Sequence, residues 1–212
     1  DYYNKKNISI LKQENLKKEW ELFPNKFTIL MPGRLTNWKG QEKFIEALNI
    51  LVEDYDNSKF QAIILGSDQG RTVYKKRLVN LIQRYRLNKK IKFIEHCKEM
   101  PLAYSIADSV VSASIEPEAF GRVSVEAQAM EKPIIASNLG GSKETILNKK
   151  SGFLYKHDDP RELAKTLNTV IELGQDALNS IGNEGRKNIT KKFDVESMCD
   201  STLREYKKLL DI

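Results

Sequence analysis

The sequence has few of the residues that form disulfides or metal sites. It contains two cysteines, Cys97 and Cys199, and two histidines, His96 and His157, among 212 residues. None of the four has the companions at ligand spacing that a zinc site needs, and a chain of this length requires no disulfide to hold its core. We therefore expect two reduced thiols in a cytoplasmic protein, no metal site and no cofactor.

Long apolar runs are also lacking. No stretch reaches the roughly 18 residues that a membrane-spanning helix needs, and no secretory signal is present. The net charge of +6 arises from 35 Lys and Arg against 29 Asp and Glu. This modest excess is not accompanied by the basic stripe with aromatic residues, or the recognition helix, that indicates nucleic-acid binding. It favours instead the approach of a phosphate-bearing ligand or an anionic membrane.

The chain begins at Asp1 in a polar segment, without a Met, and it has no internal repeat or low-complexity segment. We interpret it as a fragment of a longer protein. Its length suits one α/β domain with a substantial core, so we expect a single domain over residues 1–212.

Short apolar runs alternate with amphipathic segments along most of the chain. The runs predict strands at residues 27–31, 60–65, 91–94, 110–113, 134–136 and 152–155. Between them, apolar residues recur at helical spacing, as in residues 44–55 and 78–85. Strands that alternate with such helices pair in parallel. The sequence therefore predicts an α/β fold with a doubly wound parallel sheet.

Apolar stripes predict two further helices in the last quarter of the chain. One follows residue 160, and the other begins near Asp194, a good helix N-cap. The region of Gly174, Gly182 and Gly185 is expected to separate them.

Residues 116–130, after the fourth expected strand, carry the clearest chemical signal. They read as a loop that turns into a helix, where unpaired N–H groups and the positive end of the helix dipole favour an anion. Gly121 would let a phosphate approach the backbone, and Glu118 and Glu126 would contact different parts of one ligand. Taken alone, two glutamates eight residues apart are more often a loop residue and a solvated helix residue.

A second cluster follows the first expected strand, at residues 33–40. It places Arg34 and Lys39 between two glycines, at the sheet edge where α/β proteins bind their ligands. Arg can donate to two phosphate oxygens at once, and Lys adds a point charge to the same diphosphate. For this loop alone, a basic surface turn is the simpler interpretation.

Together, the two clusters resemble the donor-binding half of retaining glycosyltransferases of the GT-B fold, in the large family-four group. That motif is a Glu, seven residues and a second Glu, here Glu118 and Glu126, with the Phe-Gly as Phe120-Gly121. Arg34 and Lys39 match its two donor cations. The resemblance extends over about residues 26–173 and implies a Rossmann-like domain that forms the C-terminal half of such an enzyme.

The resemblance also implies a role for each matched residue. Arg34 and Lys39 would hold the donor diphosphate and act in catalysis with Glu118, which would contact the hydroxyls of the donor sugar. Glu126 would accept hydrogen bonds from the ribose hydroxyls. The remaining donor-binding residues would be those that offer backbone to the phosphates or the base: Gly33, Gly66, Ile94, Ala119, Phe120, Gly121 and Arg122.

Other matches are less informative. Glu144 follows a Gly-Gly as a glutamate commonly does in the family, but a helix-capping role explains it equally well. Tyr104 and Asp108 are interpreted as structural. The family's usual Pro-Ser after the fourth strand is Ala113-Ser114 here, which affects the turn and not the chemistry.

The function implied by the resemblance is transfer of a hexosyl group, with retention, from a UDP-, GDP- or ADP-linked sugar, in cell-envelope polysaccharide or glycolipid synthesis. The saccharide or lipid-linked acceptor would bind an N-terminal domain that this chain does not include, so the fragment by itself is expected to be inactive. No metal is required. A cytoplasmic location is compatible with peripheral association at the inner face of the plasma membrane. The alternative is a non-catalytic module that binds nucleotide sugar or docks a partner.

Overall fold

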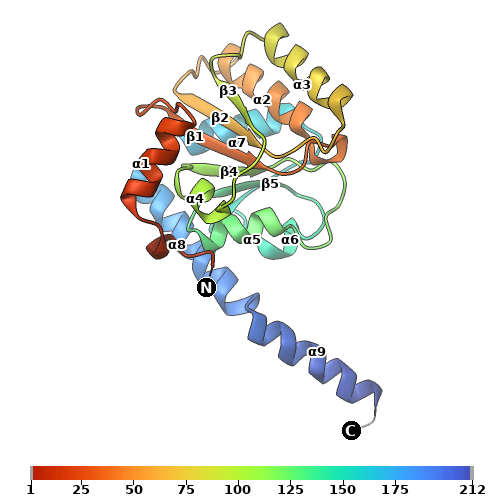
Figure 1. Ribbon diagram of the computed structural model, residues 1–212. Coiled ribbons are helices and arrows are strands. Elements are labelled where there is room, and N and C mark those ends of the chain that lie inside the picture. Colours follow the sequence, from red (N-terminus) through yellow and green to blue (C-terminus); the bar gives the residue numbers. More distant parts are fainter. Residues whose placement is uncertain (1, 211–212) are drawn as a thin grey trace.

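The structure is a computed structural model that describes residues 2–210; Asp1 and residues 211–212 of the expected domain lie outside this range. Its strands form one six-stranded sheet, and each neighbouring pair is parallel (Figure 1). The strand order is β3-β2-β1-β4-β5-β6. The strands are β1 (Phe27–Pro32), β2 (Phe60–Leu65), β3 (Ile91–Ile94), β4 (Ser109–Ser112), β5 (Ile134–Ser137) and β6 (Gly152–Tyr155). The doubly wound parallel sheet predicted from the sequence is confirmed.

Helices cover both faces of the sheet. On one face, α2, α3 and α7 pack on alternate strand residues such as Ile29 and Met31, and on the other face α1, α4 and α5 pack on residues such as Leu30. Strands of this central kind are buried on both faces, which is why they are continuous apolar runs in the sequence. The helices are α1 (Ile10–Glu19), α2 (Gln41–Glu53), α3 (Thr72–Arg84), α4 (Met100–Ser105), α5 (Arg122–Ala129), α6 (Ser142–Thr145), α7 (Pro160–Ile171), α8 (Gln175–Lys192) and α9 (Val195–Leu209), with short 3-10 turns η1 (Lys5–Asn7) and η2 (Asn37–Lys39).

The prediction that the glycine-rich region near residue 180 separates two helices was wrong in part. Gly182 and Gly185 do not separate helices but lie inside α8, which runs for 18 residues. A Cβ at Gly182 would stand 2.1 Å from the carbonyl oxygen of Glu131. The glycines therefore let α8 approach the end of α5 closely, and the packing energy outweighs their poor helix propensity.

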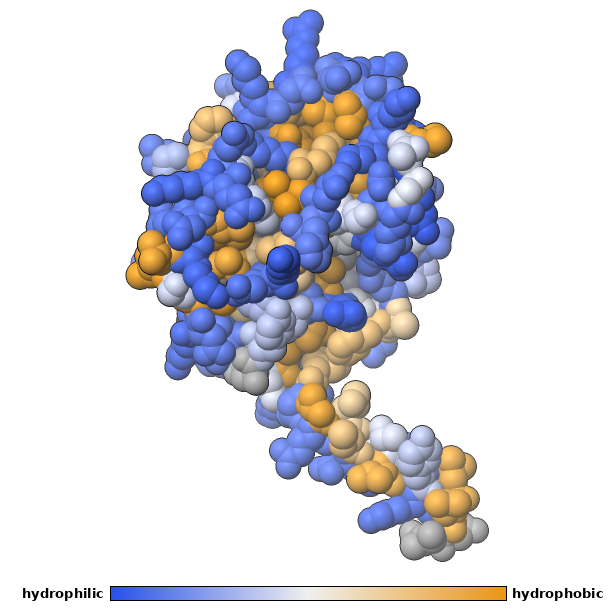
Figure 2. Space-filling view, viewed as in Figure 1, coloured by the Kyte–Doolittle hydropathy of each residue, from blue (hydrophilic) through white to orange (hydrophobic). Residues whose placement is uncertain are grey.

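The last helix, α9, leaves the body of the domain. It extends away from the sheet in Figure 1, and none of its residues is buried. Apolar side chains lie along it, and Figure 2 shows them as a row on the extended helix. They are Val195, Met198, Leu203, Tyr206 and Leu209, each more than half exposed.

The sheet order decides where a ligand can bind. The chain winds from β1 to β2 and β3, then returns to place β4 on the opposite side of β1. The loops after β1 and β4 consequently turn away from each other at the same edge, which opens a crevice between them. The first loop is the cluster at residues 33–40, and the second begins the cluster at residues 116–130, which continues into α5.

Candidate functional site

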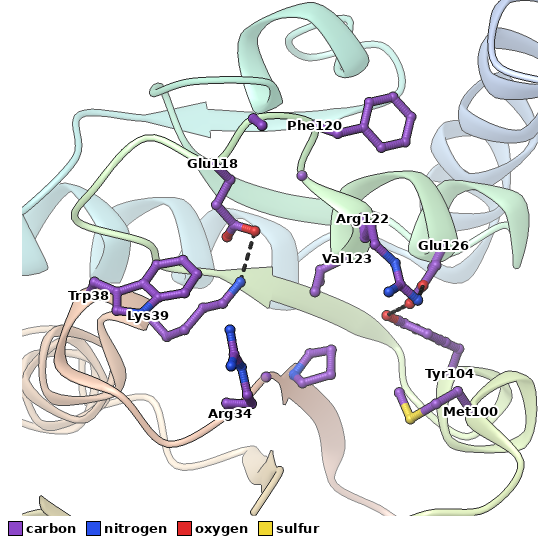
Figure 3. A pocket seen from close by; sticks show the side chains of 14 residues that line it. Arg34, Trp38, Lys39, Met100, Tyr104, Glu118, Phe120, Arg122, Val123 and Glu126 are labelled. Atoms are coloured by element: carbon purple, nitrogen blue, oxygen red, sulfur yellow. Dashed lines mark hydrogen bonds and ion pairs between the residues drawn. The ribbon is translucent and has the colours of Figure 1, made fainter. Parts of the chain in front are cut away.

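A cleft of about 490 Å³ lies at the carboxyl ends of β1 and β4 (Figure 3). Its walls come from the β1 loop, the β4 loop, α4 and the first turns of α5. The lining residues are Pro32, Gly33, Arg34, Trp38, Lys39, Met100, Tyr104, Glu118, Ala119, Phe120, Gly121, Arg122, Val123 and Glu126. The two clusters, which are about 80 residues apart in the sequence, thus form one site.

Backbone contacts hold the β1 loop against the end of β4. The N–H of Ile115 donates to the carbonyl of Trp38 at 2.9 Å. Gly40 has a φ of 74°, and a Cβ there would stand 1.9 Å from the carbonyl oxygen of Ala113. Because only glycine combines this conformation with so close an approach, Gly40 fixes the position of the neighbouring Lys39.

Lys39 and Glu118 form an ion pair within the cleft. The ammonium Nζ of Lys39 lies 2.8 Å from Oε2 of Glu118, and the two side chains are 14% and 15% exposed. The hydroxyl of Ser114 donates to the other carboxylate oxygen, and Nζ also lies 4.4 Å from the ring centroid of Trp38. Both charges are therefore held in place by neighbours from both loops.

Arg34 presents the second cation. Its backbone is fixed by Gln41, whose Nε2 donates to the Arg34 carbonyl at 2.8 Å. Its side chain rises from the end of β1 toward the Lys39 ammonium in Figure 3, and no side chain within residues 2–210 pairs with its guanidinium. The guanidinium is available to bind a phosphate.

The N-terminus of α5 provides backbone donors. The helix begins at Arg122 after Gly121, which has a φ of 76°. Within the described part of the chain, the N–H groups of Arg122 and Val123 have no acceptor, as is usual for a first turn. The preceding loop is supported from behind, since the N–H of Gly141 donates to the carbonyl of Glu118 at 2.8 Å. An anion in the cleft would meet these donors.

Glu126 lies one turn further along α5 and is held by two side chains. The hydroxyl of Tyr104 donates to its Oε2 at 2.8 Å, and Nη2 of Arg122 lies 3.1 Å from Oε1. Burial, and then the charge of Glu126, raise the pKa of Tyr104 well above its ordinary value. The hydrogen bond with Glu126 raises the pKa of Arg122. Tyr104 thus stays neutral and serves as a hydrogen-bond donor to a carboxylate.

The cleft contains every predicted site residue except Gly66 and Ile94. These two are joined by a 2.8 Å hydrogen bond from the N–H of Gly66 to the Ile94 carbonyl, at the ends of β2 and β3. Gly66 lies beside the β1 loop and Ile94 lies one strand further out, both outside the cleft lining, and their contact with a base stays a prediction. Glu144 lies in α6 and does not line the cleft either.

Some of the lining residues were not predicted from the sequence. Trp38, Met100 and Val123 were not assigned, and Tyr104 was interpreted as structural although its hydroxyl contacts Glu126. No sequence pattern signals that contact, because Tyr104 stands on α4, a separate short helix. Asp108 is structural as expected, since its Oδ2 accepts a 2.7 Å hydrogen bond from the Thr28 N–H.

Metal ligands do not gather in the described residues. Among residues 2–210, no three side chains of His, Cys, Asp or Glu are grouped so that they could hold an ion. No helix in the same range has the length and apolar character needed to cross a bilayer.

Residues 12–188 match the family described as Glycosyl transferases group 1. The chain belongs to this family. Curated relatives include the capsular polysaccharide biosynthesis glycosyltransferase CapM of Staphylococcus aureus, which is 28% identical over 196 residues, covering 89% of this chain and 50% of CapM. Spore coat protein SA of Bacillus subtilis is 27% identical and is matched over 92% of this chain and 52% of its own length. The chain spans about half the length of the curated relatives it matches.

Solved structures of the family superpose closely. A glycosyltransferase from Rickettsia africae is 33% identical with a TM-score of 0.92, covering 99% of this chain and 55% of that one. HepE from Anabaena, solved in complex with UDP and glucose, is 28% identical with a TM-score of 0.87, over 98% of this chain and 54% of HepE. The C-terminal domain of LpcC from Francisella tularensis is 26% identical with a TM-score of 0.75, over 91% of this chain and 98% of that domain. The Rossmann-like GT-B architecture is confirmed.

Proposed function

We propose that this domain binds the nucleotide-diphosphate sugar of a retaining glycosyltransferase that transfers a hexosyl group. One observation carries the proposal: Arg34, Lys39 and the unpaired N–H groups of α5 line the same cleft as Glu126. Two fixed cations and a helix N-terminus suit a diphosphate, and a carboxylate nearby suits vicinal hydroxyls.

The donor would be divided among these groups. The diphosphate lies between Arg34, Lys39 and the N-terminus of α5, and the ribose hydroxyls donate to Glu126. Glu118, held by Lys39 and Ser114, accepts hydrogen bonds from the hydroxyls of the sugar. The base extends toward Gly66 and Ile94, at the ends of the strands on the far side of the β1 loop.

The reaction breaks the bond between the anomeric carbon and the diphosphate oxygen, whose electron pair leaves with the nucleoside diphosphate. The oxygen of the acceptor hydroxyl forms the new bond on the same face, and the proton of that hydroxyl passes to the departing phosphate oxygen. Arg34, Lys39 and the α5 N–H groups stabilise the negative charge that develops on the leaving phosphate, since they are already in position. We propose that these groups suffice without a metal, and transfer by the full-length enzyme that persists in a chelator would support this.

A uridine nucleotide is the first candidate donor, because HepE was solved with UDP and glucose and is 28% identical to this chain. GDP- and ADP-linked sugars remain to be compared by titration. The capsular polysaccharide role in the name of CapM favours a cell-envelope acceptor, and with it a cytoplasmic location at the inner membrane face.

The acceptor site would be supplied by the half of the protein that this chain does not include. The exposed apolar row on α9 suits a contact with that half, because exposed apolar patches commonly mark surfaces that another protein or domain covers. In this arrangement residues 2–210 bind the donor and the other half positions the acceptor.

Calorimetric titration of the domain with UDP, GDP and ADP, each with and without an attached hexose, tests the proposal. We expect micromolar to millimolar binding of one nucleotide, weakened by Arg34→Ala and unchanged by Lys76→Ala, an exposed lysine on α3. Binding that Arg34→Ala leaves intact would contradict the site. If no nucleotide binds, the same titration of the full-length protein decides whether the other half is needed to complete the site.

A non-catalytic module is the second candidate, because one relative has the name of a spore coat protein. It predicts a full-length protein that binds nucleotide sugar but neither transfers nor hydrolyses it. Arg34, Lys39, Glu118 and Glu126 would serve either candidate, since binding of a nucleotide sugar needs the same charges, and transfer by the full-length protein decides between them.

A further inference from the structure

The hydroxyl of Tyr104 occupies an unusual position. The side chain is fully buried under the sheet, and within the described residues the hydroxyl has one hydrogen-bond partner, Oε2 of Glu126 at 2.8 Å. A buried hydroxyl with an ionised partner makes a strong and directional bond. The carboxylate orientation is thus set by a residue of α4 rather than by α5 alone.

We propose that Tyr104 is a positioning residue, which, assisted by Tyr3, turns the Glu126 carboxylate so that it can accept the two ribose hydroxyls. The inference rests on the proposed function, in which Glu126 contacts the ribose. Tyr104 itself contacts no reacting atom, and it acts through the carboxylate.

The carboxylate of Glu126 has free hydrogen-bond acceptor sites for the ribose hydroxyls. A carboxylate has about four lone-pair sites on its two oxygens. Tyr104 occupies one on Oε2, and Arg122, whose Nη2 is 3.1 Å away, occupies one on Oε1. Each oxygen therefore retains acceptor capacity for one hydroxyl, and the side chain is 14% exposed, as a group at the wall of a cleft should be.

The segment before α1 reaches the same carboxylate. The ring of Tyr3 packs edge-on against Tyr104, with centroids 6.0 Å apart and planes at 71°. Burial, and then the charge of Glu126, raise the pKa of Tyr3. Two tyrosines from different parts of the chain thus lie near the same carboxylate.

Tyr3 is fixed in this position by its own backbone. Its carbonyl accepts a 3.1 Å hydrogen bond from Nη1 of Arg186, on α8. Two residues on, Lys5 forms an ion pair with Glu131, just after α5. The polar segment at the start of the chain is therefore held to α8 and to the C-terminal end of α5, the helix that carries Glu126.

The alternative is that Tyr104 only fills the core between α4 and α5. A titration separates the two roles, because only a positioning residue changes the contribution of the ribose hydroxyls. The probes are UDP and 2′,3′-dideoxy-UDP, which lacks both hydroxyls. The readout is the ratio of their dissociation constants, and it is insensitive to a general loss of folded protein.

The variants are Tyr104→Phe and, as a matched control, Tyr155→Phe. Tyr155 is another buried tyrosine whose hydroxyl has a partner, Ser137, outside the cleft. We expect Tyr104→Phe to reduce the preference for UDP about tenfold with little change in dideoxy-UDP binding, as the loss of one bond to a charged group implies. Tyr155→Phe should retain the preference.

Glu126→Gln separates this inference from the proposed function. If Glu126→Gln loses the preference while Tyr104→Phe keeps it, or if Tyr104→Phe weakens both ligands equally, the positioning role is wrong and the donor site stands. If Glu126→Gln keeps the preference, Glu126 does not bind the ribose and both are overturned. For Tyr3, a Tyr3→Phe variant that behaves like Tyr2→Phe, at the exposed neighbour, would remove its part in the inference.

Discussion

The ammonium of Lys39 lies 2.8 Å from Oε2 of Glu118, so the cation assigned to the diphosphate and the carboxylate assigned to the sugar are partners of each other. Both side chains are largely buried, and each limits the rotamers of the other. A buried pair of this kind is costly to break from one side, because the remaining charge has no compensation. Substitutions at the two residues should consequently affect nucleotide binding differently.

Lys39→Ala is expected to weaken UDP binding tenfold or more. The variant removes a charge-assisted contact of about 1.5–3 kcal/mol to the diphosphate, and it leaves Glu118 to repel the ligand. Calorimetric titration measures the loss, with Lys76→Ala as the exposed lysine control. Affinity within twofold of the original would show that Lys39 does not contact the phosphates.

Glu118→Gln is expected to leave UDP binding unchanged or slightly stronger, because the amide no longer competes with the diphosphate for Lys39. It should instead remove the gain in affinity that an attached hexose provides. Glu126→Ala should weaken UDP itself. The ratio of the UDP-hexose and UDP dissociation constants distinguishes the two variants. Equal losses of UDP affinity on substitution of the two glutamates would contradict their separate roles.

Gly40→Ala is expected to destabilise the domain by about 2–4 kcal/mol, since the new methyl combines a strained φ with a clash against the Ala113 carbonyl. Gly70→Ala is the matched control: its φ is 81°, but a Cβ there meets nothing within 4 Å. Urea unfolding of both variants measures the difference. A similar loss of stability for the two variants would mean that the β1 loop accommodates the new methyl group without a further loss of stability.

Stability should depend on the ionisation of Lys132. Burial lowers the pKa of this lysine from 10.5 to about 8, although nearby Asp108 acts in the opposite direction. Between these values the folded protein has released a proton that the unfolded chain still holds, so the free energy of unfolding rises with pH. Below pH 8 Lys132 keeps its charge in the folded protein, so the full cost of burying that charge lowers the free energy of unfolding.

Lys132→Met removes this dependence. The difference in free energy of unfolding between the variant and the original protein favours the variant most at pH 7. It should shrink by on the order of 2 kcal/mol between pH 7 and pH 10, because Lys132 of the original protein becomes neutral. Urea unfolding across that range tests it, with Lys165→Met on the exposed side of α7 as the control. Parallel stability curves for Lys132→Met and the original would contradict the shifted pKa.

Much of the fold could be predicted because its strands are buried on both faces. An apolar run such as residues 60–65 has few other places to lie, and alternation with helices requires parallel pairing. The location of the site could be predicted for a related reason, since the carboxyl ends of neighbouring parallel strands meet at one edge of the sheet. The sequence therefore predicted that Arg34 and Glu118 lie at the same edge of the sheet.

The prediction that glycines end the helix was wrong for α8. Gly182 lowers helix propensity, and from sequence alone it predicts a break. The structure places the backbone of Glu131 against it, so that tertiary packing reverses the preference. A local rule cannot include a neighbour that is 51 residues away in the sequence.

The sequence by itself determined which elements form and which residues gather at the ligand edge, because hydrophobic periodicity and glycine positions are local properties of the chain. Only the tertiary structure decided which polar groups pair within the site. Lys39 bonds Glu118, and Tyr104 bonds Glu126, because side chains on separate elements meet at distances that depend on how those elements pack. Hydrogen bonds require ångström geometry, and a pattern of residue types does not contain it.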